Sequence, residues 1–110
     1  MKKIKLLLDF GAGPIWKEYI NPDTMEEYTG VKIIDENKEI MELNDEIQDM
    51  FTKYYEANSH GVSMWFNKKQ QKEDKQIMMS KINKLVEMLD EVNDGSFKID
   101  DQISKIYKKL

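Results

Sequence analysis

The sequence contains no cysteine and no arginine, only two prolines, and a single histidine, His60. Without cysteine the chain cannot form disulfides, so its fold must depend on packing, and a reducing compartment is permitted. Without arginine it lacks the bidentate guanidinium contacts that favour binding to phosphates and base edges. We therefore expect no direct binding of nucleic acid, although a lysine-rich genome would also explain the bias.

Long apolar runs are also missing. Near the N-terminus, Lys2, Lys3 and Lys5 are interleaved with a short apolar run that ends at Asp9. A run of about five residues is too short for a signal sequence and far too short to span a membrane. We expect a cytoplasmic protein with no membrane partner.

Motifs for catalysis and ligand binding are absent as well. No nucleophile context of the GxSxG type occurs. The glycines at 11 and 13 do not form a phosphate-binding loop, because Pro14 and Ile15 follow where a lysine or a helix-opening glycine is needed. One histidine without cysteine cannot supply a transition-metal site, and the acidic residues lack calcium-loop spacing. We expect no enzyme activity, no cofactor and no metal.

A catalytic interpretation would start from Asp9 and His60. Asp9 follows a predicted strand beside a glycine loop, and histidine is the usual proton shuttle. The structural alternative is that Asp9 bonds the backbone of residues 11–13, while His60 is a surface or C-capping residue at a helix end. We favour the structural alternative for both residues.

What the sequence does contain is organised around its opening stretch, which reads KIKLLLDFGAGPIW from Lys3 to Trp16. The short apolar run 4–8 predicts a buried strand, because a turn cluster follows it. Residues 11–14 must form a loop, since glycine and proline interrupt regular elements. Ile15 and Trp16 are then expected to fold back over the strand, so we interpret this stretch mainly as scaffold.

Two helices have the clearest patterns. Asn44 can cap the first, whose apolar stripe runs from Ile47 to Tyr55 and which would end at residues 58–61. The second is predicted to start in the polar run after Asn67 and to end at residues 93–95. Its stripe consists of Met78, Ile82, Leu85, Leu89 and Val92.

The segments before the first helix are less regular. Thr24 and Glu27 match a capping box, which predicts a helical turn that ends near Gly30. Residues 31–35 and 39–43 predict either a hairpin or an irregular connection, because strict alternation fails at 33–34.

The segments around the second helix predict short elements. Residues 62–66 are a strand or a loop with buried aromatics, and residues 97–99 are a strand. Asp100 can cap a terminal helix whose face is formed by Ile103, Ile106, Tyr107 and Leu110. The element order predicts a single α/β or α+β domain over residues 1–110, with a small two- to four-stranded sheet packed by two long helices and a short C-terminal helix.

The charge is unevenly distributed along the chain. Residues 21–59 carry a balance of -8 and residues 60–84 a balance of +4, against a net charge of -4 for the whole chain. A solvated helix face would explain some of this acidity. Seven acids fall between Asp35 and Asp49, however, and such like charge costs self-repulsion. The acidic stretch therefore predicts fast association with a basic protein.

The opening stretch resembles that of a family of small bacterial proteins, in which a strand precedes Asp, an aromatic, Gly, two variable residues, Pro, an aliphatic residue and Trp. Here these positions are Asp9, Phe10, Gly11, Pro14, Ile15 and Trp16. The likeness continues more loosely at residues 43–47, at Tyr54 and Tyr55, and at residues 61–66. Some members of this family are similar to immunity proteins of polymorphic toxin systems, including contact-dependent growth inhibition.

The resemblance implies a protein that binds and neutralises the C-terminal domain of a toxin, such as a basic nuclease or tRNase, by blocking its active site. It also implies no small-molecule substrate. Carboxylates would face the basic cleft of the toxin, and aromatic residues would act as anchors, whereas Trp16 is expected in the core. The implied toxin-binding residues are Asp35, Glu36, Glu39, Glu42, Asp45, Asp49, Glu56, Tyr19 and Trp65.

Two other functions stay open on the sequence. The first is a small non-enzymatic cytoplasmic adaptor or interaction domain without a toxin partner. The second is a hydrolase that uses Asp9 and His60. A toxin gene directly upstream would favour immunity over the adaptor, and activity that depends on both residues would favour the hydrolase.

Overall fold

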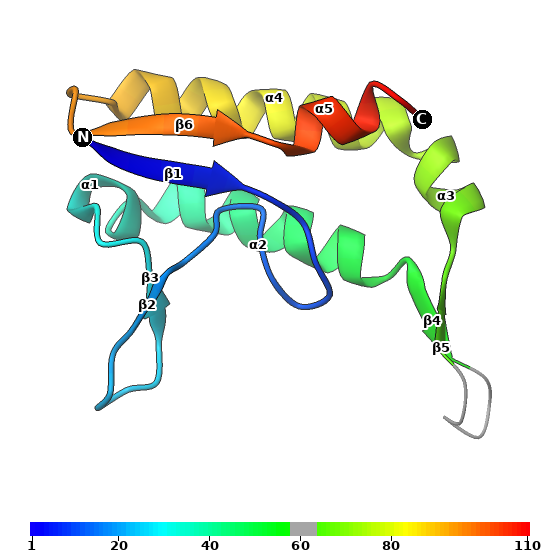
Figure 1. The fold of residues 1–110 in the computed structure, drawn as a ribbon, viewed down its shortest axis with the longest axis horizontal. Coiled ribbons are helices and arrows are strands. Elements are labelled where there is room, and N and C mark those ends of the chain that lie inside the picture. The colour runs from blue at the N-terminus through cyan, green and yellow to red at the C-terminus, as the bar shows by residue number, and fades with distance from the viewer. Residues whose placement is uncertain (58–63) are drawn as a thin grey trace.

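The computed structural model describes residues 1–57 and 64–110. The fold is a mixed α+β domain (Figure 1), as predicted. Its elements, in chain order, are β1 (Lys2–Leu6), β2 (Tyr19–Ile20), β3 (Glu27–Tyr28), α1 (Lys32–Asp35), α2 (Lys38–Thr52), β4 (Tyr55–Ala57), β5 (Met64–Phe66), α3 (Lys68–Glu73), α4 (Lys75–Val92), β6 (Phe97–Asp101) and α5 (Ile103–Tyr107).

The central sheet pairs the first strand with the last. β1 and β6 run parallel, with Ile4 opposite Ile99. The predicted strand at 97–99 is confirmed, and the opening strand begins two residues earlier than residues 4–8 predicted. On its other side β1 continues into an antiparallel bridge between Leu6 and Ile15, so the predicted return of residue 15 over the strand is confirmed.

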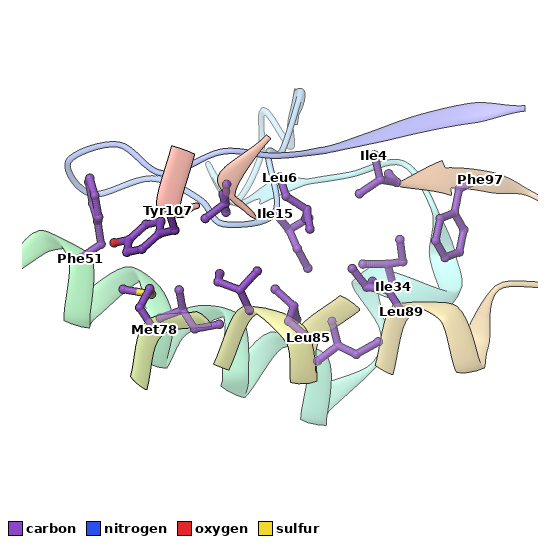
Figure 2. Close-up of a cluster of buried hydrophobic side chains, with 14 of the residues drawn as sticks. Ile4, Leu6, Ile15, Ile34, Phe51, Met78, Leu85, Leu89, Phe97 and Tyr107 are labelled. Atoms are coloured by element: carbon purple, nitrogen blue, oxygen red, sulfur yellow. The ribbon is translucent and has the colours of Figure 1, made fainter. Parts of the chain in front are cut away.

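The core lies between this sheet and one layer of helices. α2 and α4 pack against each other, and Figure 2 shows side chains of the strand layer, such as Leu6 and Ile15, pointing toward Leu85 of α4. The predicted stripe of α4 is confirmed, since four of its five residues are fully buried and Val92 is partly buried. The spacing of four and three residues brings these side chains to one face of the helix. The fully buried four are Met78, Ile82, Leu85 and Leu89.

The first long helix starts earlier than predicted. Asn37, not Asn44, is its cap, because the Asn37 side chain accepts a hydrogen bond from the backbone N–H of Ile40 at 3.0 Å. Both alternatives for 31–35 and 39–43, the hairpin and the irregular connection, are wrong, since these residues form α1 and the first turns of α2. Good helix formers such as Glu39 and Met41 extend the helix over this segment.

The C-terminal end of α2 also differs from the prediction. The helix ends at Thr52, and Tyr55 leaves it to pair with Phe66 in the β4–β5 ribbon. Aromatic packing explains the early end, because the ring of Phe66 lies 5.6 Å from that of Phe51 and 5.0 Å from that of Tyr55. The strand predicted at 62–66 is confirmed for residues 64–66, and residues 58–63 lie outside the described part of the chain.

The helical turn predicted near Gly30 is wrong, because the segment forms the β2–β3 hairpin. Tyr19 pairs with Tyr28 across it. The side chain of Asn21 accepts hydrogen bonds from the backbone of residues 23 and 24, and Met25 adopts a positive φ of 62°. This local turn satisfies the backbone groups that a capping box would have used, so the helix does not form.

The long helix predicted from Asn67 is divided into α3 and α4 at Asp74. The carboxylate of Asp74 accepts hydrogen bonds from the hydroxyl of Tyr54 at 3.0 Å and from the amide of Gln70 at 2.9 Å. Burial, and then the bond to Asp74, raise the pKa of Tyr54 above the ordinary value for a phenol. The hydroxyl therefore remains a donor, and this contact connects the break to the end of α2.

The terminal helix is confirmed, but its cap and its face differ from the prediction. Asp101, rather than Asp100, accepts hydrogen bonds from the N–H and the hydroxyl of Ser104. Ile103 and Tyr107 are buried, whereas Ile106 and Leu110 are exposed. Because β6 extends to residue 101, α5 begins later and turns only two of the four predicted side chains inward.

Candidate protein-interaction surface

The opening motif is used mainly to attach its own loop to α2. The N–H of Ile15 donates to the side-chain oxygen of the buried Asn44 at 2.8 Å. The N–H of Gly11 donates to the hydroxyl of Thr52 at 3.1 Å, and the amide of Gln48 donates to the Gly11 carbonyl at 2.9 Å. These three contacts come from the face of α2 that is turned toward the loop, which supports the scaffold interpretation.

Gly13 cannot carry a side chain in this loop. It is buried with a φ of +86°, and a Cβ placed on it would overlap the backbone carbonyl of Leu7. Gly11 also has a positive φ, of +68°, but nothing lies within 4 Å of an added Cβ. The strictest steric requirement of this loop thus falls on Gly13, at a position that the motif leaves variable. The peptide bond from Gly13 to Pro14 is cis.

Asp9 has a local role at the start of this loop. Its carboxylate accepts a hydrogen bond from the N–H of Phe10 at 2.8 Å, and its backbone pairs with that of Ala12. The predicted structural role of Asp9 is confirmed: it bonds the backbone of residues 11–13 at Ala12, through its own backbone groups and not through its carboxylate. The other half of the hydrolase hypothesis, His60, lies outside the described residues.

Four of the predicted toxin-binding carboxylates lie together along the exposed side of α2. They follow one another at intervals of three, three and four residues, which places neighbours on the same side of a helix. Each is exposed to solvent. We call this set the acidic face; it consists of Glu39, Glu42, Asp45 and Asp49.

Few internal cations neutralise the acidic face. Lys38 lies 4.0 Å from Glu42, and both side chains are highly exposed. Within residues 1–57 and 64–110, Asp45 and Asp49 make no ion pair with a lysine. On the side toward α4, Glu46 pairs with Lys81 at 2.9 Å. The acidic face therefore keeps most of its charge available to solvent.

Two predicted carboxylates precede the acidic face and differ from it. Asp35 is half-buried, and its carboxylate accepts hydrogen bonds from the N–H and hydroxyl of Thr29 and from the N–H of Gly30. It therefore closes the turn between β3 and α1 rather than facing outward. Glu36 is exposed and lies 4.0 Å from Lys32, so it stays accessible to a partner.

The predicted residues Glu56 and Trp65 meet each other on the β4–β5 ribbon. They are opposite in register, and the indole N–H of Trp65 donates to Glu56 at 3.0 Å. Asn67 donates to the second oxygen of the same carboxylate at 3.2 Å. Trp65 is 48% exposed, so an aromatic face oriented by this contact is presented to solvent.

Tyr19, the other predicted anchor, lies on the β2–β3 hairpin. It is 44% exposed and stacks on Tyr28 with ring centroids 5.5 Å apart. The ammonium of Lys2 donates to the Tyr19 hydroxyl at 2.8 Å and lies 4.1 Å from the ring centroid. Tyr19 is thus held in place although it is exposed, which suits a recognition residue.

Sequence reasoning missed the rest of this hairpin, because it predicted a helical turn there. Ile20, Met25 and Tyr28 are all exposed. The available signal was the short run Tyr19–Ile20 before the Asn-Pro-Asp turn, which is typical of a hairpin connection. Exposed apolar side chains on a projecting element indicate an interaction site.

The hairpin and the ribbon flank the acidic face. Figure 1 shows both projecting from the same edge of the molecule, one near each end of α2. A hollow of about 440 Å³ lies between the motif loop and the β2–β3 hairpin, with Trp16, Met25 and Asp45 among its lining residues. Trp16 is therefore partly exposed there rather than fully in the core. Carboxylates and exposed aromatics thus share one side of the protein.

Neither a metal site nor a membrane-spanning helix is found among the described residues. No set of three His, Asp or Glu side chains in residues 1–57 and 64–110 is arranged as metal ligands. No helix among the described elements combines the length and apolar character needed to cross a membrane. Comparison with protein-family models, curated proteins and solved structures finds no match to this chain.

Proposed function

We propose that this protein is a cytoplasmic immunity protein that binds and neutralises the C-terminal toxin domain of a contact-dependent growth inhibition effector. It would act by binding and not by catalysis. The observation that carries the proposal is the acidic face of α2, whose carboxylates are exposed and mostly unpaired within the described residues. The resemblance of the opening motif to immunity proteins supports the same conclusion.

The chemistry of the acidic face suits a basic nuclease as partner. A row of carboxylates can occupy a cleft that otherwise binds phosphates, and complementary fields accelerate encounter between the two proteins. Glu36 extends the same sign beyond the start of α2. Asp35 contributes to the field but is engaged in the fold, so we assign it no direct contact with the toxin.

The exposed aromatic residues would provide anchors on both sides of the acidic face. Tyr19 and Trp65 are each oriented by an internal hydrogen bond, which lowers the entropy lost when a partner packs on them. Tyrosine and tryptophan are also the residue types most enriched among energetically important contacts. Glu56 would act mainly by holding Trp65.

The direct test is protection of a growing cell. The upstream toxin's C-terminal domain is expressed from an inducible promoter in a host with or without this protein, and growth and complex formation are measured. We expect growth to be rescued and the two proteins to copurify as a stable heterodimer. A catalytically dead toxin domain serves as a control, because it should still form the complex without requiring protection.

The experiment also distinguishes the adaptor alternative. A small adaptor without a toxin partner would neither rescue growth nor copurify with the toxin domain. If growth is rescued only when Asp9 and His60 are both intact, while the complex forms without them, the hydrolase hypothesis would replace binding as the mechanism.

A further inference from the structure

A small apolar pocket lies at the end of the molecule where the β4–β5 ribbon, α3 and α5 come together. Its volume is about 220 Å³. Pockets for drug-sized ligands are larger, roughly 300–1,000 Å³, so this one suits a single side chain. Its apolar lining consists mainly of Leu8, Phe51, Tyr55, Phe66, Ile106 and Tyr107.

The lining contains no charged side chain. Its amide group, on Gln71, donates to the Tyr107 hydroxyl at 3.3 Å and is thereby engaged within the protein. Burial raises the pKa of Tyr107, so its hydroxyl remains uncharged at neutral pH. An aromatic or aliphatic occupant therefore meets no charged group on entering the pocket.

Exposed apolar groups continue outward from the pocket. Ile106 is 49% exposed although it lines the pocket, and Phe10, at 52%, packs edge-on against Tyr55 at 5.1 Å. Met64 lies two residues before Phe66 and so shares its side of the ribbon. The pocket is thus the deepest point of a larger apolar surface, which is typical of an interface.

Helical spacing places lysines near the rim of the pocket, although none lines it. Lys68 lies one turn before Gln71 on α3, Lys109 lies one turn after Ile106, just beyond the end of α5, and both are exposed. Lys72 and Lys105 add two more positive charges on the same two elements.

The acids nearest to this rim are mostly engaged. Glu56 bonds Trp65, Asp74 bonds Tyr54, and Asp101 bonds Ser104. Two acids near the pocket are exposed: Asp9, which follows Leu8 of the lining, and Glu73, which lies beside Lys72 on α3. The field around the pocket therefore favours a partner with carboxylates beside its apolar group.

We propose that this pocket binds one aromatic or aliphatic side chain of the toxin partner, in a segment that carries carboxylates next to that side chain. The inference rests on the proposed function for the identity of the partner. It adds a second contact of opposite charge to the acidic face, so the toxin would be held at two places that fix its orientation.

Peptide binding tests the chemistry of the pocket without a toxin. Acetyl-Asp-Glu-Phe-Glu-Asp-amide is titrated into the labelled protein and followed by NMR, alongside the same peptide with Gly for Phe and with Lys for all four acids. We expect amide shifts in β4, β5 and α5, and binding weaker by about tenfold or more for both comparison peptides. Equal binding of all three peptides, or no shift at the pocket, overturns the proposal.

Substitutions locate the binding. Ile106→Asp should weaken the acidic peptide strongly, and it should fold because the side chain is half exposed. Lys68→Glu with Lys109→Glu should do the same, whereas Lys84→Glu with Lys98→Glu, exposed on other elements, gives the same change in net charge as a control. An equal loss in both double variants contradicts a local basic rim.

Two further outcomes identify a different occupant. If dodecanoate shifts the pocket amides and the acidic peptide does not, the ligand is an alkyl chain. If the same shifts appear on raising the protein concentration, with a dimer in sedimentation, the occupant is a second copy.

The toxin complex separates this inference from the proposed function. If Ile106→Asp binds the toxin as tightly as the unmodified protein, the pocket inference fails and immunity stands. If the unmodified protein neither binds the toxin nor protects, immunity fails while the peptide titration still decides the pocket chemistry.

Discussion

The two sides of α2 use their polar residues in opposite ways. On the side toward the motif loop, Asn44, Gln48 and Thr52 each make a hydrogen bond to the loop backbone. On the adjoining acidic face, Asp45 and Asp49 make no ion pair with any described lysine. One side is bonded to the loop, although the buried Nδ2 of Asn44 has no partner among the described residues, and the other side is left for solvent or a partner.

This difference separates what the opening motif explains from what it does not. Its Gly11, Pro14 and Ile15 serve the loop and the core. A resemblance carried by these residues therefore concerns the scaffold, and the partner must be recognised by surface residues outside the motif. The following predictions test whether the two sides of α2 are separable in this way.

The largest effect is expected at Gly13. In Gly13→Ala the new Cβ would overlap the carbonyl of Leu7, and the residue would also have to keep a φ of +86°. We expect a loss of more than about 4 kcal/mol in the free energy of unfolding, or no soluble protein. Chemical denaturation followed by circular dichroism measures it.

Gly11→Ala is the matched control for this substitution. Gly11 has a similar φ of +68° but open space around its Cβ position. The left-handed conformation alone should cost about 1–2 kcal/mol. If both variants lose the same stability, steric contact with Leu7 is not what requires the second glycine.

A smaller but still substantial effect is expected at Asn44. Asn44→Ala removes the acceptor for the buried N–H of Ile15 and leaves that donor unpaired. We expect a loss of about 3 kcal/mol, from the unsatisfied group and the cavity together. Gln48→Ala, which removes a more exposed bond to Gly11, should cost about 1 kcal/mol. Thermal unfolding of both variants checks the order.

Reversing the acidic face should affect association and leave stability nearly unchanged. In the triple variant Glu42→Lys, Asp45→Lys and Asp49→Lys we expect the rate of association with the toxin to fall by about tenfold or more at low salt. The difference should shrink as salt is added, because screening weakens the field. Stopped-flow measurements at two salt concentrations test this.

Three exposed acids of α4 provide the control for the triple variant. Reversing Glu87, Asp90 and Glu91 to Lys produces the same change in net charge on a different helix. The association rate should fall much less. An equal decrease in the two triple variants would mean that net charge, and not the acidic face, steers the toxin.

Much of the fold could be predicted from local patterns. The stripe of α4 depends only on the helical repeat, and the two strands of the central sheet are short apolar segments bounded by turns. Their parallel pairing connects residues at opposite ends of the chain. No local pattern contains that information, because it depends on how the helices pack between them.

The candidate site was predictable in charge but not in arrangement. Either Asn37 or Asn44 could cap the helix on sequence grounds. Asn37 is the cap, because Asn44 instead accepts a hydrogen bond from Ile15, which lies 29 residues earlier in the chain. The same tertiary contacts extend α2 and align four carboxylates. The partners of Asp35 and Glu56 could not be inferred, because each depends on a turn or strand pairing.

The smallest effect is expected at Glu46, which lies on the side of α2 toward α4. Its carboxylate pairs with Lys81 of α4 at 2.9 Å, yet it remains well exposed. Glu46→Gln should therefore lower the free energy of unfolding by less than about 1 kcal/mol. Glu42→Gln, at 4.0 Å from Lys38 with both side chains highly exposed, should produce no measurable loss.

These two substitutions test whether the exposed carboxylates of α2 contribute to the stability of the fold. If even Glu46, the carboxylate of α2 with the shortest ion pair among the described residues, contributes little, ion pairing within the protein does not explain why α2 carries so many acids. A decrease of more than about 2 kcal/mol in the free energy of unfolding of Glu46→Gln, measured by denaturant titration, would mean that an exposed carboxylate of α2 stabilises the fold. The comparison between the two sides of α2 would then be wrong.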